Sequence, residues 1–307
     1  MIDYQLAVRQ KQAQIKETLT TRQPSTELEK QFFIFMRSEY IKNQQSLNVA
    51  ADMLEIQIEN AKRNHKINID DIRLYDNKHT KKTAVVVAFG ASLRHDIDHL
   101  IKVKDKYLIV AVDRAAEYLM QRGVKPKYFV CCDCRSKAEW LGSYDYSGCV
   151  LLAFMGTSAD YCERFVELGG QVSFFLLPCR ASTHLTIRDA IGYELPLIPV
   201  SGNVSQAAVV LADFLLGCRK MLLLGFDYGH DGEWYYPDEL IADTDQKVDG
   251  MRTTTDITGQ QFFTDDEFLT YILYLKEWIF ERKLENKVVN CSAYGLLDIK
   301  RDKFINY

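Results

Sequence analysis

Long apolar runs are missing from this chain of 307 residues. None of its hydrophobic segments reaches the roughly 18 residues that a membrane-crossing helix requires, so we expect no membrane span. The N-terminal stretch MIDYQLAVRQKQ has no apolar core of the kind that marks a signal peptide. Together these absences predict a cytoplasmic protein.

An excess of basic residues is missing as well. The chain has 38 Lys and Arg against 42 Asp and Glu, which gives a formal net charge of −4 at pH 7. This balance argues against a protein that holds nucleic acid mainly through a basic face, but it leaves nucleic acid open as a transiently bound acceptor. A hydrophobic content of 47% is normal for a globular protein with a sizeable core.

The eight cysteines form neither a disulfide framework nor a full metal-binding pattern. Cys131 and Cys134 have CxxC spacing, but no second pair accompanies them and they follow an apolar strand. We expect reduced, mostly buried thiols, with a redox or zinc role as the weaker alternative. A hydrolase triad also lacks support, because the chain shows neither GxSxG nor a Ser-His-Asp order.

What the sequence does contain is the usual first unit of a parallel α/β sheet. Ala84 to Ala88 are apolar and mostly β-branched, which predicts a buried strand. Phe89 to Ser92 then turn the chain, and a helix is predicted from Leu93. This turn is neither GxGxxG nor GxxxxGK[ST], so no standard nucleotide motif supports it.

The turn nevertheless has the features of a phosphate site. It lies at the carboxyl end of a predicted strand, where α/β sheets bind ligands, and the helix start offers free N–H groups. Gly90 lets the backbone approach a ligand closely, with Ala91 beside it, and Ser92 either caps the helix or donates to a phosphate. The alternative is a plain turn with a serine cap.

From Lys82 onward predicted strands and helices alternate, and no internal repeat is visible. This alternation predicts an α/β fold with an open, mostly parallel Rossmann-like sheet and helices on both faces. Residues 81–307 would form this Rossmann-like domain. After the first unit, the predicted strands cover residues 107–112, 127–132, 149–154, 172–177, 220–224 and 288–291, and the predicted helices cover residues 114–122, 158–168, 201–216 and 265–282.

Residues 1–80 form a polar N-terminal segment with two patterns of helical spacing, at 27–43 and 47–63. We interpret it as a helical arm without chemistry of its own. The arm is expected to pack on the main domain or on a partner chain, and the second case would make the protein a homo-oligomer.

Three predicted strands end in an aspartate: Asp113, Asp133 and Asp227. Because the carboxyl ends of parallel strands share one edge, their carboxylates are expected to converge on one cleft near Gly90. There they would hold Mg²⁺, bind ribose hydroxyls or act as a base. The alternative is that each aspartate caps the turn that follows it.

A second small-residue turn, Ser201-Gly202-Asn203, opens a later helix and is either an anion site or a cap. A long loop runs from Tyr228 to about Thr264 and suggests a lid or a substrate loop. Its Tyr228, Tyr235 and Tyr236 would contact a phosphate, stack on a base or pack the loop. His230 between them is a candidate base.

In order and spacing these segments resemble the family of the MptE-like 6-hydroxymethylpterin diphosphokinase domain and the motility accessory factors thought to glycosylate flagellin. The resemblance spans residues 83 to about 300. It departs from the family at Ala91, usually Pro, and at Lys127, usually Asp. The landmarks here are Gly90-Ala91-Ser92-Leu93, Val110 to Asp113, Gly123 to Tyr128, Asp133, Gly202-Asn203-Val204 and Leu216 to Asp227.

The same landmarks resemble bacterial lipooligosaccharide sialyltransferases. That likeness implies a nucleotide and its phosphates held by Gly90, Ser92, Ser201, Gly202 and Tyr235. Those enzymes carry a histidine base in the segment that corresponds to residues 249–256, and this chain has no histidine there. His230 or an aspartate would have to replace it.

Three functions follow as hypotheses. The first is an inverting glycosyltransferase that uses a nucleotide sugar, with Asp227 or His230 deprotonating a glycan, protein or small-molecule acceptor. The second is an ATP-dependent pterin pyrophosphokinase, with Asp113 and Asp133 holding Mg²⁺. The third is a non-catalytic nucleotide-binding assembly or regulatory protein. The arm and the long loop favour a macromolecular acceptor, and with it the first hypothesis.

Overall fold

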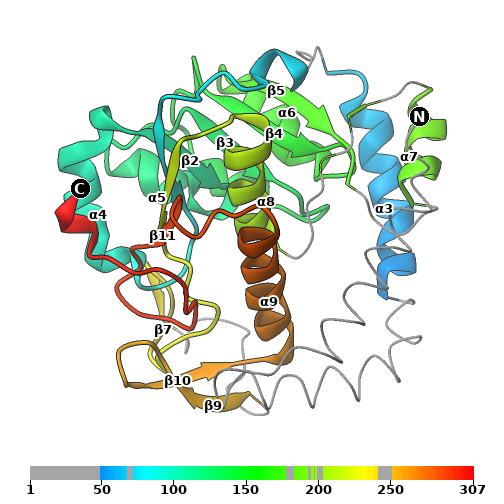
Figure 1. Cartoon of the computed structure of the whole chain (residues 1–307). Coiled ribbons are helices and arrows are strands. Elements are labelled where there is room, and N and C mark those ends of the chain that lie inside the picture. Colours follow the sequence, from blue (N-terminus) through cyan, green and yellow to red (C-terminus); the bar gives the residue numbers. More distant parts are fainter. Residues whose placement is uncertain are drawn as a thin grey trace.

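A seven-stranded sheet organises the chain. In the computed structural model its strands run in the order β11-β6-β1-β2-β3-β4-β5, and every neighbouring pair is parallel (Figure 1). The structure describes residues 49–67, 72–177, 183–192, 195–196, 198, 203–240 and 251–307. The strands of this sheet are β1 Thr83–Val87, β2 Leu108–Val112, β3 Tyr128–Cys131, β4 Val150–Phe154, β5 Gln171–Phe175, β6 Lys220–Leu224 and β11 Val288–Asn290.

Helices connect and cover the strands. Parallel strands need right-handed crossovers, so the helices between β1 and β5 lie on one face, and α8, which precedes the return to β6, lies on the other. α8 packs across β1, β2 and β3 and continues as a π-helical turn over Leu211–Leu215. The α-helices are α3 Val49–Asn64, α4 Leu93–Val103, α5 Ala116–Gln121, α6 Ala159–Glu167, α7 Thr183–Ile191, α8 Val204–Val210 and α9 Asp266–Glu281.

The strands read as continuous apolar runs because both faces of the sheet are covered. Every residue of β2, β3 and β4 is buried. The predicted fold class is therefore confirmed, with strand bounds within a residue or two of the predicted ones. Among the described helices, none has both the length and the apolarity needed to cross a membrane.

The carboxyl ends of β1 and β6 are joined tightly. The N–H of Gly90 donates to the carbonyl of Gly225 at 3.0 Å, which extends the strand pairing into the two following turns. A Cβ atom at Gly90 would lie 2.5 Å from Cγ of Asp227 and 2.6 Å from the Gly225 oxygen. Only glycine permits this approach, and it places the two turns side by side at one edge of the sheet.

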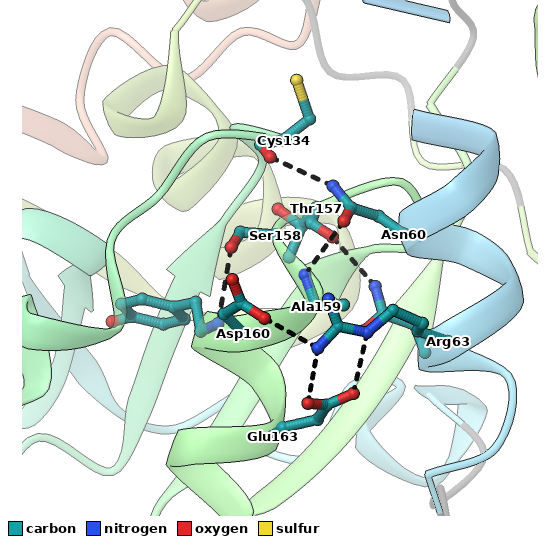
Figure 2. A network of polar contacts seen from close by, with 10 residues as sticks. Asn60, Arg63, Cys134, Thr157, Ser158, Ala159, Asp160 and Glu163 are labelled. Carbon is teal, nitrogen blue, oxygen red and sulfur yellow. Dashed lines mark hydrogen bonds and ion pairs between the residues drawn. The ribbon is translucent and has the colours of Figure 1, made fainter. Parts of the chain in front are cut away.

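Helix α3 is docked on the sheet domain. Asn60 donates to the carbonyl of Cys134 at 3.0 Å, and Arg63 binds Asp160 and Glu163 on α6 (Figure 2). The side chain of Asn64 is fully buried and donates to the carbonyls of Met155 and Thr157 at 3.0 and 2.9 Å. The helix predicted at 47–63 thus exists and packs on the main domain, whereas residues 1–48 lie outside the described part.

The described parts of the segment from Tyr228 to Thr264, residues 228–240 and 251–264, contain short strands. They form the antiparallel pair β7 Trp234–Tyr236 and β8 Glu239–Leu240, and the pair β9 Arg252–Thr255 and β10 Gln261–Thr264. Figure 1 shows β7, β9 and β10 grouped beyond one end of the sheet. Sequence analysis missed these hairpins because their strands are short and carry no strong alternation.

Candidate functional site

A cleft of about 290 Å³ lies at the carboxyl edge of the sheet. Its floor is made by the ends of β1, β2, β3 and β6, and its walls come from the start of α8, the β7 strand and α9. The lining residues are Ala88, Phe89, Gly90, Val112, Asp113, Arg114, Asp133, Trp140, Asn203, Val204, Ser205, Gly225, Phe226, Asp227, Tyr228, Gly229, Tyr235, Tyr236 and Phe268.

The three strand-end aspartates share this cleft, as the strand pattern predicted. Asp113, Asp133 and Asp227 all line it. Their surroundings differ, however: Asp113 and Asp227 are buried and Asp133 is exposed. The parallel sheet explains why the three residues lie together. Burial disfavours the ionised form of Asp113 and Asp227 but not that of the exposed Asp133.

Asp227 is held by Ser92 from the facing turn. The N–H of Ser92 donates to one carboxylate oxygen at 2.7 Å, and its hydroxyl donates to the other. Burial raises the pKa of Asp227 to about 7, although the hydrogen bonds from Ser92 oppose this shift. Each carboxylate oxygen keeps a second lone pair, so the group remains able to accept a proton.

Ser92 thus binds Asp227, whereas the sequence predicted that it would cap α4 or donate to a phosphate. Ser92 is fully buried, makes no side-chain cap on α4 and is absent from the cleft lining, as is Ala91. Gly90 does line the cleft. The serine cap is therefore wrong, and phosphate binding by this turn stays a prediction in which Phe89 and Gly90, but not Ala91 or Ser92, line the ligand space.

The carboxylate of Asp113 accepts hydrogen bonds from other protein groups. It accepts from Ser136 Oγ at 2.5 Å, from Cys131 Sγ at 3.2 Å and from the N–H of Arg114 at 2.9 Å. Burial raises its pKa. Asp133 accepts from the N–H of Arg135 at 2.8 Å in the turn that follows β3.

These two residues do not fit Mg²⁺ as they stand. Oδ2 of Asp113 already accepts two hydrogen bonds and Oδ1 accepts one, and burial favours the neutral form of the group, which binds a cation poorly. Within the described part of the chain, no group of three or more His, Cys, Asp and Glu is arranged to hold a metal ion. We derive no step through a metal at this pair.

His230 does not line the cleft. Its ring is fully buried and stacks on Phe263, with 5.3 Å between centroids. Nδ1 accepts from the N–H of Gly232 at 3.1 Å, and Nε2 faces the sulfur of Met251 at 3.1 Å. Burial lowers its pKa. This geometry favours Asp227 over His230 as the base.

The tyrosines do line the cleft. Tyr228 adopts φ 57°, a strained value for a residue other than glycine, directly after Asp227. Its buried hydroxyl has no partner in full hydrogen-bond geometry, and burial raises its pKa while Ser205 and Gln206 oppose the shift. The rings of Tyr235 and Tyr236 on β7 meet edge to face, with 4.7 Å between their centroids.

Asn203 also lines the cleft, and it caps α8. Its side-chain oxygen accepts from the N–H of Gln206 at 3.1 Å and from the Ser205 hydroxyl at 2.6 Å. Ser201 and Gly202, predicted to bind the nucleotide with it, lie outside the described residues.

Sequence analysis missed one residue of the cleft that carries charge. Arg114 follows Asp113 and lines the cleft, where its guanidinium lies over three aromatic rings. A single arginine after a strand has no pattern in the sequence that sets it apart from a solvent-exposed one. Only the strand-end position next to Asp113 offered a signal.

The comparisons with known proteins identify the family of this chain. A family model, described as 6-hydroxymethylpterin diphosphokinase MptE-like, matches residues 55–233, which is more than half of the chain. The chain belongs to this MptE-like family. The match begins inside α3 and covers Gly90 and the three aspartates, and it ends just before β7. No curated protein matches the chain.

One solved structure supports the fold. The MAf glycosyltransferase from Magnetospirillum magneticum AMB-1 aligns with 82% of this chain at 18% identity and a TM-score of 0.60. The chain covers only 38% of that protein. A protein from Lactobacillus plantarum matches at 13% identity over 67% of this chain and 60% of its own, with a TM-score of only 0.28.

Both names denote transferases, a diphosphokinase and a glycosyltransferase. The family description therefore supports this class, whereas the likeness to the glycosyltransferase shows the fold alone.

Proposed function

We propose that this MptE-like protein is a nucleotide-dependent glycosyltransferase that moves a sugar from a nucleotide sugar to an acceptor hydroxyl. The observation that carries the proposal is Asp227, a buried carboxylate that lines the cleft and has a pKa of about 7. A base that titrates near neutral pH is matched to taking a proton from a hydroxyl. The likeness in fold to a glycosyltransferase supports the same class.

The proposed reaction is a single displacement. The acceptor oxygen attacks the anomeric carbon of the sugar, and its proton passes to a carboxylate oxygen of Asp227. The bond between that carbon and the donor's phosphate oxygen breaks, and the phosphate leaves with the electron pair. Because attack and departure occur on opposite faces, the configuration at the anomeric carbon inverts.

Ser92 positions the base in this scheme. Its two hydrogen bonds fix the plane of the Asp227 carboxylate and stabilise the charged form. In this scheme Tyr235, which lines the same cleft, donates its hydroxyl to the leaving phosphate. The acceptor class, whether glycan, protein or small molecule, is left open.

The family description favours a second candidate, an ATP-dependent diphosphokinase that acts on 6-hydroxymethylpterin. Such an enzyme needs a divalent ion to bridge the ATP oxygens. The hydrogen bonds that occupy Asp113 count against this assignment.

Ligand binding separates the two candidates. We expect CMP-, UDP- or GDP-sugars to raise the melting temperature in the presence of EDTA, because a ligand bound to the native state stabilises it. Tyr235→Phe should weaken this effect, whereas Tyr274→Phe on α9, outside the cleft lining, should not. Stabilisation by ATP that strictly requires Mg²⁺, with no response to any nucleotide sugar, would establish the diphosphokinase instead.

Nucleotide-sugar binding without any transfer would leave the third hypothesis, a nucleotide-binding assembly or regulatory protein. The transfer assay therefore follows the binding assay, with release of free nucleotide as its readout in the presence and absence of candidate acceptors.

A further inference from the structure

Arg114 lies in an aromatic cage. Its guanidinium carbon lies 5.3 Å from the ring centre of Phe89, 5.1 Å from that of Trp140 and 5.1 Å from that of Tyr236. These rings come from the β1 turn, the segment after β3 and the β7 strand. Stacking on rings restricts a guanidinium to few orientations. The cage therefore fixes the directions in which the N–H groups of Arg114 can donate hydrogen bonds.

The charged partner of this guanidinium is Glu239 on β8. Nη2 of Arg114 donates to Oε2 of Glu239 at 3.2 Å, and the two side chains are about 26% and 32% exposed. Glu239 itself is not part of the cleft lining, whereas Arg114 is. The carboxylate therefore reaches Arg114 from β8, a strand that contributes no residue to the cleft lining.

The cleft otherwise carries acidic groups. Among the residues that line it in the described part of the chain, Arg114 is the one cation, whereas Asp113, Asp133 and Asp227 are acidic. A phosphate ester entering this cleft would meet repulsion from any ionised carboxylate. Its attraction to the site must come from Arg114 and from uncharged donors.

We propose that Arg114 binds the phosphate of the donor next to the transferred group, and that Glu239 occupies the guanidinium until the donor displaces it. This assignment deepens the proposed function and rests on it for the identity of the donor. A phosphate presents two oxygens to the planar guanidinium, and the diphosphate of a UDP- or GDP-sugar carries two negative charges against the one of a carboxylate, so it outcompetes Glu239. In this way one residue serves both as the anion-binding group and as the contact that holds the β7–β8 hairpin before binding.

The chain contains a matched control for this pair. Arg94 binds Asp231 at 3.1 Å and lies 4.8 Å from the ring of Trp234, at the other end of the same hairpin. This pair has the same chemistry and similar exposure, but neither member lines the cleft. Arg94→Gln therefore tests the loss of a caged arginine without the loss of a cleft cation.

The experiment measures binding of inorganic pyrophosphate and of the best nucleotide sugar by calorimetry to the full-length protein and three variants. We expect Arg114→Gln to weaken both ligands about 10- to 100-fold, since hydrogen bonds to charged groups are among the stronger ones. Glu239→Gln should bind both about two- to fivefold more tightly, because the competing carboxylate loses its charge. Arg94→Gln should change neither affinity by more than about twofold.

Equal affinity of Arg114→Gln and the unaltered protein for both ligands would overturn the inference, and so would weaker binding by Glu239→Gln. Failure of the unaltered protein to bind pyrophosphate would overturn it too. Pyrophosphate binding that depends on Arg114, without binding of any nucleotide sugar, would keep the anion site and remove the glycosyltransferase proposal. If Arg114→Gln does not fold, Arg114→Lys and Glu239→Gln test the inference instead. We expect Arg114→Lys to bind both ligands more weakly than the unaltered protein, but less weakly than expected for Arg114→Gln.

Discussion

At the scale of single residues, burial and hydrogen bonding set the chemistry of Asp227. Removal from water raises its pKa to about 7, and Ser92 moves it in the opposite direction. An exposed aspartate would be fully ionised at neutral pH but a weak base. The buried Asp227 is partly ionised at neutral pH and is a stronger base than an exposed aspartate. General-base catalysis needs both a sufficient ionised fraction and sufficient basicity.

Transfer activity is therefore expected to rise with pH through about 7, because only the ionised form of Asp227 accepts the proton. Asp227→Asn should lower kcat by about 10²- to 10⁴-fold and abolish this rise. Asp98→Asn, an exposed aspartate on α4, is the control and should keep both. A pH–rate profile of the three proteins checks the prediction, and an unchanged rise in Asp227→Asn would contradict it.

Ser92→Ala offers a finer test of the same pair. Loss of the hydroxyl removes one of the hydrogen bonds that lower the pKa of Asp227. The midpoint of the pH–rate profile should move to higher pH, with activity largely restored above it. A purely structural serine would reduce activity equally at all pH values, so the position of the midpoint distinguishes the two roles.

At the scale of elements, the tight contact between the turns after β1 and β6 builds the site. Gly90→Ala would place a Cβ atom 2.5 Å from Cγ of Asp227 and 2.6 Å from the backbone oxygen of Gly225. Since backbone cannot move aside cheaply, we expect a loss of about 1 to 3 kcal/mol in the free energy of unfolding together with loss of activity.

Gly259→Ala is the comparison for this substitution. Its Cβ would meet nothing within 4 Å, but its φ of +88° strains any side chain. It should cost about 1 kcal/mol or more from backbone strain and leave ligand binding intact. Denaturant unfolding combined with calorimetry checks both variants, and normal ligand binding by Gly90→Ala would show that the close contact is not needed.

The docking of α3 gives a second prediction at this scale. Asn64→Ala would leave the buried carbonyls of Met155 and Thr157 without their donor, which should cost about 2 kcal/mol or more. Arg63→Ala removes two ion pairs that are largely exposed (Figure 2), so it should cost about 1 kcal/mol or less. Urea unfolding measures both, and a larger effect at Arg63 would reverse this ranking of buried over exposed contacts.

At the scale of the whole molecule, several features were predictable because they depend on local patterns. Apolar runs with β-branched residues predicted every strand of the large sheet, and their alternation with helices predicted the parallel fold. The parallel arrangement in turn predicted that Asp113, Asp133 and Asp227 would share one cleft. The resemblance to the MptE-like family rested on the same landmarks and is confirmed.

What the sequence by itself determined is thus the sheet, its edge and the residues that reach that edge, because periodicity and strand direction are properties of neighbouring residues. Tertiary structure alone decided which carboxylates are buried and that Ser92 donates to Asp227. It also decided that His230 lies outside the cleft lining and that Arg114 pairs with Glu239. Each of these depends on contacts between segments far apart in the chain. Burial and hydrogen bonding across such contacts, not the residue type, fix the pKa and the partner of each group.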